Sequence, residues 1–112
     1  MINHYSACLL IDEGKLLLKK DNLDLPTTKI NESETTESAA LRIAKEIGID
    51  ADIERFFALE FFSGEQVYTY LCNIKSIGEL SNEYNWHRID DIKTRQLSEN
   101  LSAIIDKIKV IL

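Results

Sequence analysis

The sequence is poor in the residues that mark secreted, disulfide-bonded or fibrous proteins. It has two cysteines, one proline and four glycines among 112 residues. Cys8 and Cys72 lie in apolar, strand-like segments and belong to no C-x-x-C motif, so we expect buried, reduced thiols rather than a disulfide or a metal pair. No linker of Gly, Ser or Pro divides the chain, and we expect a single domain over residues 1–112.

Positive charge is also scarce. The chain has 13 Lys and Arg residues against 19 Asp and Glu, which gives a formal net charge of −6. Its basic residues are scattered, whereas a nucleic-acid surface needs them clustered to neutralise phosphates. Nucleic acid is therefore not an expected partner. A small anion such as a nucleotide needs only local donors and stays open as a ligand.

Long apolar runs are absent as well. No stretch approaches the ~20 apolar residues of a membrane-spanning helix, and the first ten residues lack the charged region of a secretory signal. We therefore expect no membrane association and a cytoplasmic location. The remaining composition, 45% apolar and 29% charged residues, is typical of a globular protein.

Alternating apolar and polar residues predict the order hairpin, loop, helix, hairpin, short strand, helix. A polar loop should follow Pro26, the only proline. The short strand is expected near Trp86. The two predicted hairpins run over 5–11 with 15–20, turning at Asp12-Glu13-Gly14, and over 53–62 with 66–74, turning at Ser63-Gly64.

Two segments have the period of an amphipathic helix. The first runs from Thr35 to Ile47 and ends at Gly48, and the second starts near Ser98. Each has one apolar stripe, so we expect an α/β (α+β) fold in which a mixed sheet lies between the two helices. The strand residues predicted to be largely inaccessible are Leu9, Ile11, Leu16, Leu18, Phe57, Leu59, Val67 and Leu71.

The run from Leu25 to Ile49 resembles the Nudix box, G-x5-E-x7-R-E-U-x-E-E-x-G-U, where U is aliphatic. Thr28 takes the glycine place, Glu34 the first glutamate and Arg42 the arginine. Later, Glu46 matches a glutamate, and Gly48-Ile49 matches the end of the box after one deletion. The segment from Glu83 to Trp86, followed by Asp90-Asp91, is similar to a pattern in the C-terminal part of Nudix proteins. The resemblance spans nearly the whole chain and implies a Nudix-type fold.

The same resemblance exposes a departure in the chemistry. In Nudix hydrolases the R-E-U-x-E-E segment projects three carboxylates from one helix face, and these bind Mg²⁺ or Mn²⁺ for attack on a pyrophosphate. Here the three places hold Ile43, Glu46 and Ile47. Isoleucine has no lone pair for a hard cation. Thr27 and Thr28 replace the paired loop glycines, and β-branched residues have a stiffer backbone that tolerates positive φ poorly.

Candidate site residues follow from this comparison. Glu46 is the candidate catalytic residue and metal ligand, with a surface ion pair to Arg42 as the alternative. The resemblance implies that Glu34 and Arg42 form a structural pair between loop and helix. The candidate substrate-binding residues are Thr28, Lys29 and Trp86, although a tryptophan here is more often packed under the last helix.

Other residues have weaker functional interpretations. Ile43 and Ile47 either widen the core or form an exposed apolar patch. His4 and His87 are expected to be solvated strand-end residues, and the aromatic run 56–62 to belong to the core. The carboxylates that could replace the lost ligands from neighbouring loops are those of Glu60, Glu65 and Glu83.

Two hypotheses for function remain. The first is a ligand- or partner-binding module that keeps the Nudix fold without its usual metal-dependent catalysis. It would recognise a nucleotide-like small molecule or a protein, and could form a homodimer. The second is a divergent Mg²⁺-dependent Nudix hydrolase of a nucleotide-type diphosphate. Fold alone does not decide between them. The two isoleucines favour the first hypothesis.

Overall fold

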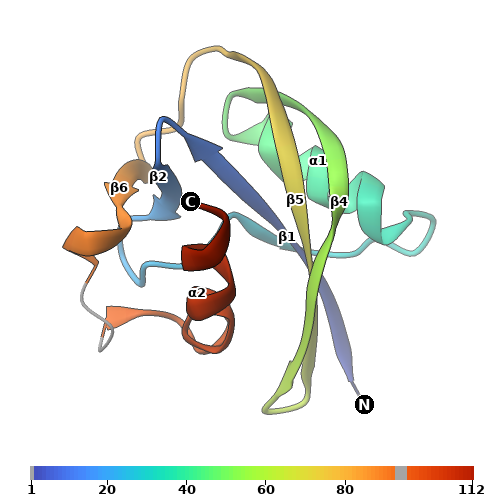
Figure 1. The fold of residues 1–112 in the computed structure, drawn as a ribbon. Coiled ribbons are helices and arrows are strands. Elements are labelled where there is room, and N and C mark those ends of the chain that lie inside the picture. Colours follow the sequence, from blue (N-terminus) through green and yellow to red (C-terminus); the bar gives the residue numbers. More distant parts are fainter. Residues whose placement is uncertain (1, 93–95) are drawn as a thin grey trace.

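The computed structural model describes residues 2–92 and 96–112. These residues form a six-stranded mixed sheet with a helix on each face (Figure 1), which confirms the predicted fold class. The strand order is β4-β5-β1-β2-β6, and the short β3 pairs with β1 beside this path. The elements are β1 (Asn3–Asp12), β2 (Lys15–Lys19), β3 (Thr27–Lys29), α1 (Thr36–Glu46), β4 (Ile49–Phe62), β5 (Glu65–Ile77), β6 (Tyr84–Arg88), a 3-10 helix (Ile89–Asp91) and α2 (Glu99–Ile111).

Strand β1 is the centre of the sheet. It pairs in parallel with β5 along one edge, while its other edge pairs with β3 over Tyr5–Ala7 and with β2 at Ile11 and Asp12. Its side chains alternate between two cores: Ala7 and Leu9 face α2, and Cys8 and Leu10 face α1. The strand is therefore buried from both sides, as its continuous apolar run predicted.

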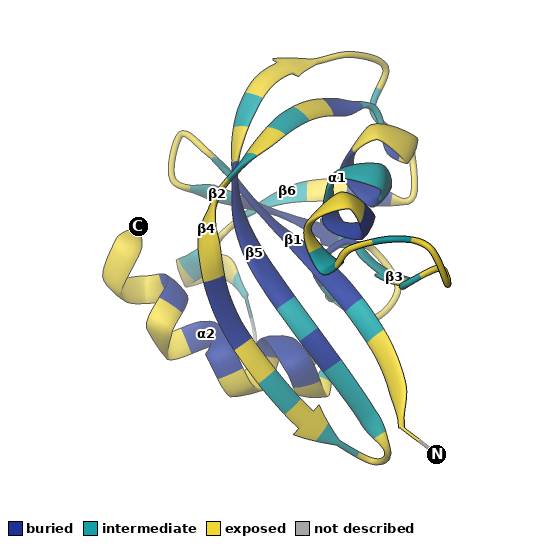
Figure 2. Cartoon of the chain, turned by 90° about the vertical axis from the view of Figure 1, so that its right-hand side faces the viewer, coloured by how far each residue is buried: buried dark blue, intermediate teal, exposed yellow. Residues whose placement is uncertain are grey.

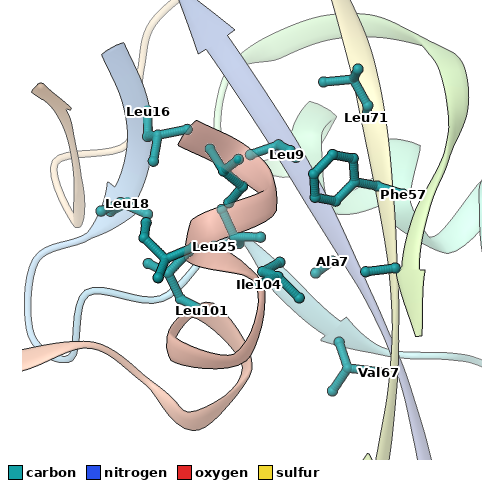
Figure 3. Close-up of a cluster of buried hydrophobic side chains, with 13 residues drawn as sticks. Ala7, Leu9, Leu16, Leu18, Leu25, Phe57, Val67, Leu71, Leu101 and Ile104 are labelled. Carbon is teal, nitrogen blue, oxygen red and sulfur yellow. The ribbon is translucent and has the colours of Figure 1, made fainter. Parts of the chain in front are cut away.

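The core beneath α2 contains leucines from β1 and β2, Phe57 from β4, and the buried stripe of α2 (Figure 3). Each large side chain fully buried here contributes about 1.5–3 kcal/mol to folding. The buried residues of α2 are Asn100, Leu101, Ile104, Ile105 and Ile108.

No helix in the described part of the chain is both long and apolar enough to cross a membrane.

Helix α1 begins and ends where local signals predicted. Thr35 is its N-cap and forms a capping box with Ser38, in which the Ser38 amide donates to Thr35 Oγ1 at 3.0 Å. The Thr35 amide donates in return to Ser38 Oγ at 3.1 Å. Gly48 follows the C-cap residue with a φ of +103°, a conformation that favours glycine.

Both predicted hairpin turns are confirmed. Glu13 and Gly14 have φ values of 51° and 76°, and Ser63 and Gly64 have 49° and 76°. Two successive residues in the left-handed region are typical of the type I′ turn, whose twist matches that of the flanking strands. Each turn therefore sets the register of the residue pairs next to it, and the pairing of β4 with β5 shifts register farther from the turn.

The prediction that Leu59 is largely inaccessible was wrong, since its exposed fraction is 41%, and Ile11 of the same set is only half-buried. Phe56 and Phe61, expected in the core, are 48% and 61% exposed. Leu59, Phe56 and Phe61 all lie on the side of the edge strand β4 that faces α1. The helix starts only at Thr36, whose Oγ1 lies 2.6 Å from the Tyr70 hydroxyl. Figure 2 shows β4 and β5 continuing past this point with no helix over the α1 side, whereas α2 lies on the other side.

The two cysteines are buried beside each other on β1 and β5. Their sulfur atoms are 3.3 Å apart and hydrogen-bonded, without a disulfide. The hydrogen bond to Cys72 and burial both raise the pKa of the Cys8 thiol. The thiolate is the reactive form of cysteine, and a raised pKa disfavours it. We therefore interpret this pair as part of the packed core.

Gly48 offers a test of the α1–β4 junction. A Cβ there would collide with the backbone carbonyl oxygen of Glu79, and the φ of +103° is strained for any other residue. We expect Gly48→Ala to lower the free energy of unfolding by more than about 3 kcal/mol. The control is Gly14→Ala, where a Cβ meets open space at a φ of +76°, and the expected loss is about 1–2 kcal/mol. Equal losses in urea titrations would contradict this account.

Candidate functional site

Arg42 connects the loop before α1 to the helix itself. Its Nε donates to Glu34 Oε2 at 2.7 Å and its Nη2 to Glu34 Oε1 at 3.0 Å, a bidentate ion pair. Nη2 also donates to the carbonyl oxygen of Lys29 at 2.9 Å, and Nη1 to Glu46 Oε1 at 3.1 Å. Arg42 therefore holds both the loop and the Glu46 carboxylate.

These contacts shift both ionisations toward the charged forms. The hydrogen bond from Arg42, followed by that from the Asn31 amide, lowers the pKa of Glu34. The hydrogen bonds to Glu34 and Glu46 raise the pKa of Arg42 above its ordinary value. The ion pair is thus intact throughout the neutral range.

The helix face that would carry metal ligands lies inside the core. Ile43 and Ile47 are 8% and 5% exposed and belong to the cluster under α1, with Leu17 of β2 and Tyr84 of β6. The two isoleucines therefore widen the core and do not form an exposed patch. Glu46 is the one carboxylate among the three positions, and its side chain is 54% exposed.

Other carboxylates do not complete a metal site around Glu46. Over residues 2–92 and 96–112, no group of three or more His, Cys, Asp or Glu side chains could hold a metal ion. Glu60 and Glu65 instead line hollows that also contain residues of α2. Glu83 is exposed and lies just before β6.

The two threonines in place of the loop glycines belong to β3, which corrects the prediction of a loop. Thr27 pairs with Ala7 and Thr28 with Ser6. An extended backbone suits β-branched residues, so no glycine-like conformation is required of them. Thr28 is half-buried, and the Lys29 side chain is exposed while its carbonyl oxygen binds Arg42.

We expected Trp86 to pack under the last helix, and this expectation was wrong. It pairs with Leu17 across β2 and β6 and contacts the core on the α1 side. Paired residues share a face of the sheet, so His87, opposite Leu16, is on the α2 side. His87 is half-buried rather than solvated, and its Nε2 is buried with no hydrogen-bond partner within the described residues. His4 is exposed, as predicted.

A pocket of about 400 Å³ lies at the start of α2, between the loop that precedes β3 and the β4–β5 turn. Asn100 in its lining is 3% exposed. The Asn100 amide nitrogen donates to Thr69 Oγ1 at 3.5 Å, whereas Oδ1 is buried and has no partner among the residues that the structure describes. Sequence reasoning missed this pocket because its residues come from several separate segments and form no motif.

Asp24 joins the pocket loop to α2. Its Oδ1 accepts hydrogen bonds from Ser98 Oγ at 2.6 Å and from the Leu25 amide at 2.9 Å. Ser98 is also the N-cap of α2 and accepts from the Leu101 amide at 3.1 Å. Burial raises the pKa of Asp24, and the hydrogen bonds from Ser98 and Leu25 oppose that shift. The carboxylate thus stands at the positive end of the helix.

No protein-family model and no curated protein matches the sequence. Solved structures match its shape. A Nudix hydrolase from Nitrosomonas europaea has a TM-score of 0.85 at 17% identity, over 98% of this chain and 90% of that one. The chain has the Nudix fold. A MutT Nudix hydrolase from Burkholderia pseudomallei scores 0.78 at 15% identity, over 96% and 98% of the two chains. An ADP-ribose pyrophosphatase from Streptococcus suis scores 0.74 at 14% identity, over 97% and 92%.

In this fold the segment that resembles the Nudix box lies next to the central strand of the sheet. Residues 25–49 run through β3 and α1 beside the centre of the sheet, and the Arg42 ion pairs fix their path. The resemblance in sequence is therefore matched by the fold. These identities establish the fold alone, and the chemistry depends on the side chains that this fold carries.

Burial of the two isoleucines can be tested by restoring carboxylates. Ile43→Glu with Ile47→Glu would place two unpaired carboxylates in the core, each costing several kcal/mol. A domain has about 5–15 kcal/mol of stability, so we expect the double variant to lose cooperative thermal unfolding. The matched control is Ile77→Glu, because Ile77 is 43% exposed. A folded double variant as stable as this control would show that the face is open.

Replacing Arg42 tests the loop–helix ion pair. Lysine cannot donate to Glu34, Glu46 and the Lys29 carbonyl together, so Arg42→Lys should be less stable than the parent at pH 7. The pKa of Glu34 is lowered in the folded state, so the contribution of this carboxylate is present above its unfolded pKa of about 4.3 and lost as pH falls. Urea titrations should therefore show a stability difference that shrinks below about pH 4. A difference independent of pH would exclude an ionic cause.

Proposed function

We propose that this protein is a small-molecule-binding module that has kept the Nudix fold without metal-dependent hydrolysis at α1. The observation that carries the proposal is the burial of Ile43 and Ile47, which are 8% and 5% exposed. Their side chains occupy the helix face that carries metal-binding carboxylates in the resembling family. That face therefore serves packing in this chain.

The donor set at α1 does not fit Mg²⁺ or Mn²⁺. Mg²⁺ prefers nearly octahedral oxygen coordination, and Glu46 supplies the one carboxylate of the three positions. Its Oε1 is already paired with Arg42 at 3.1 Å. A cation approaching Glu46 would also meet the charge of the Arg42 guanidinium. Both effects weaken metal binding there.

A divergent Mg²⁺-dependent hydrolase is the second candidate. The partly exposed Glu46 favours it, since one carboxylate plus substrate phosphates sometimes suffices for Mg²⁺. Thr28, Lys29 and Trp86 would then lie along the approach to a nucleotide-type diphosphate. Trp86, however, is half-buried against the α1-side core, which leaves less of its ring for stacking.

The better-formed ligand site is on the other face of the sheet. The α2-side pocket has a volume of about 400 Å³, within the usual range for small-molecule sites. Its polar groups converge from the Asp24 loop, the start of β5 and the first turn of α2. A pocket of this kind supports binding of a small molecule independently of α1.

Metal titration separates the two candidates. A ligand that binds the native state raises its melting temperature according to RT ln(1 + [L]/Kd). We expect millimolar Mg²⁺ or Mn²⁺ to shift the melting temperature of the parent no more than that of Glu46→Gln. Glu79→Gln, an exposed carboxylate outside α1, controls for nonspecific charge effects. A specific shift lost only in Glu46→Gln would favour the hydrolase.

The accompanying activity assay measures cleavage of the diphosphate linkage over a panel of nucleoside diphosphate derivatives. We expect no turnover above that of Glu46→Gln in saturating Mg²⁺. Turnover by the parent that depends on both Mg²⁺ and Glu46 would overturn the proposed function.

A further inference from the structure

Strand β4 is the outer strand on one side of the sheet, and among the residues that the structure describes no strand lies beside its free edge. Proteins protect such edges with bulges, charges or covering elements, because unpaired N–H and C=O groups can pair with another strand. The first part of β4 has this protection. Its pairing with β5 shifts register three times before Ala58, and Lys107 Nζ of α2 donates to the Phe57 carbonyl oxygen at 3.0 Å.

The last part of β4 lacks this protection. Residues 58–62 pair with β5 without a register shift, and they include no proline, lysine or arginine. Leu59 and Phe61 in this stretch are 41% and 61% exposed. Both lie on the α1 side of the sheet, where no helix covers β4 (Figure 2). A regular strand edge therefore coincides with an uncovered apolar face, and we call residues 58–62 the open edge.

Aromatic rings extend the apolar face toward the centre of the sheet. Leu59 pairs with Tyr68, whose ring stacks on that of His4 with centroids 6.4 Å apart. Phe56 meets Tyr70 edge to face at 5.5 Å. These contacts hold the rings in place before a partner binds, which lowers the entropy cost of ordering them. The side chains of an added strand would thus meet a preformed surface.

The charge of β4 selects among possible occupants of this edge. The strand has one guanidinium and four carboxylates, which belong to Asp50, Asp52, Glu54 and Glu60. The whole chain has a net charge of −6. A second copy would bring an identical acidic strand to the edge, whereas a basic segment is attracted to it. Glu60 belongs to the open edge and pairs with Val67 of the α2-side core, so its carboxylate is on that side of the sheet.

We propose that the open edge binds an extended basic segment of a partner protein, which adds a strand to the sheet beside β4. In this mode of recognition, main-chain hydrogen bonds give affinity and alternate side chains give specificity. Apolar side chains of the segment contact Leu59 and Phe61, and its basic side chains lie near Glu60. The segment therefore alternates apolar and basic residues. The inference goes beyond the proposed function, because Leu59 and Phe61 lie on the opposite face of the sheet from the α2-side pocket.

Peptide probes test the alternation and the charge. The first probe is a hexapeptide of alternating lysine and valine, blocked at both ends. The second has the same composition with its lysines and valines in two blocks, and the third alternates glutamate and valine. Titrations followed by amide chemical shifts should show the first binding at least about tenfold more tightly than the others, the factor that 1.4 kcal/mol produces. The largest shifts should belong to residues 58–62.

N-methylation tests the main-chain pairing. Successive N–H groups of an extended strand point to opposite edges, so one alternate set of the peptide's amides faces β4. Two derivatives of the Lys-Val peptide carry methyl groups either on the lysine amides or on the valine amides. One derivative should lose binding and the other should keep it. Equal affinities of the two derivatives would exclude strand addition.

Variants of the protein locate the apolar and the charged contacts. Leu59→Ser removes an exposed side chain, so it should fold and weaken the Lys-Val peptide by about threefold or more. Its matched control is Ile77→Ser, because Ile77 is 43% exposed at the far end of β5. Glu60→Gln should weaken the same peptide by about twofold or more. Glu79→Gln changes the net charge equally outside β4 and should leave the affinity unchanged.

The outcomes separate the possible occupants. Equal binding of the glutamate and lysine peptides would overturn the basic class of partner. No binding of the Lys-Val peptide, or shifts confined to other parts of the protein, would overturn the open edge as a docking site. Sedimentation velocity tests for a second copy: we expect the parent to be monomeric, and a dimer abolished by Leu59→Ser would replace the partner protein by a second copy. The metal titration and activity assay do not involve this edge and stand independently.

Discussion

The rest of the structure depends on β1, which has hydrogen-bonded neighbours on both edges and a helix on both faces. Its alternation sends Ala7 and Leu9 to one core and Cys8 and Leu10 to the other. Backbone groups of a buried strand must all find partners, and β1 finds them in β5, β3 and β2. The short β3 is therefore needed to complete the hydrogen bonding of β1. Without it, the first half of the β1 edge that also pairs with β2 would stay unpaired. This pairing places the box-like segment beside the sheet.

The sequence predicted correctly those features that depend on interactions between residues close together in the chain. The Thr35 cap, the turns at Gly14 and Gly64, and the stripe through Ile43 each depend on residues close in sequence. The exposure of Leu59 depends instead on where α1, a distant helix, begins. The side on which Trp86 packs depends on which strand residue lies opposite it. Apolar character alone does not contain that information, because about half of a protein's surface is apolar as well.

The candidate site was predictable to a similar extent. The spacing of Glu34 and Arg42 in a box-like segment pointed to their ion pair, and the replacement of carboxylates by Ile43 and Ile47 was visible directly. The burial of those isoleucines could not be predicted from the sequence, because it depends on the positions of β2 and β6. No motif in the sequence indicated the α2-side pocket. Its residues become neighbours only when the loop around Asp24 and the first turn of α2 meet.

The two faces of the sheet have consequently taken different roles. On the α1 side, the isoleucines close the space with apolar contacts, and Glu46 is held by Arg42 at the surface. On the α2 side, the buried amide oxygen of Asn100 has no partner in the described part of the chain, although a leucine of similar volume would pack without that cost. Packing therefore explains the residues of α1 but not Asn100. This unexplained cost lies beside the pocket, and it supports the proposed small-molecule site on the α2 side of the sheet.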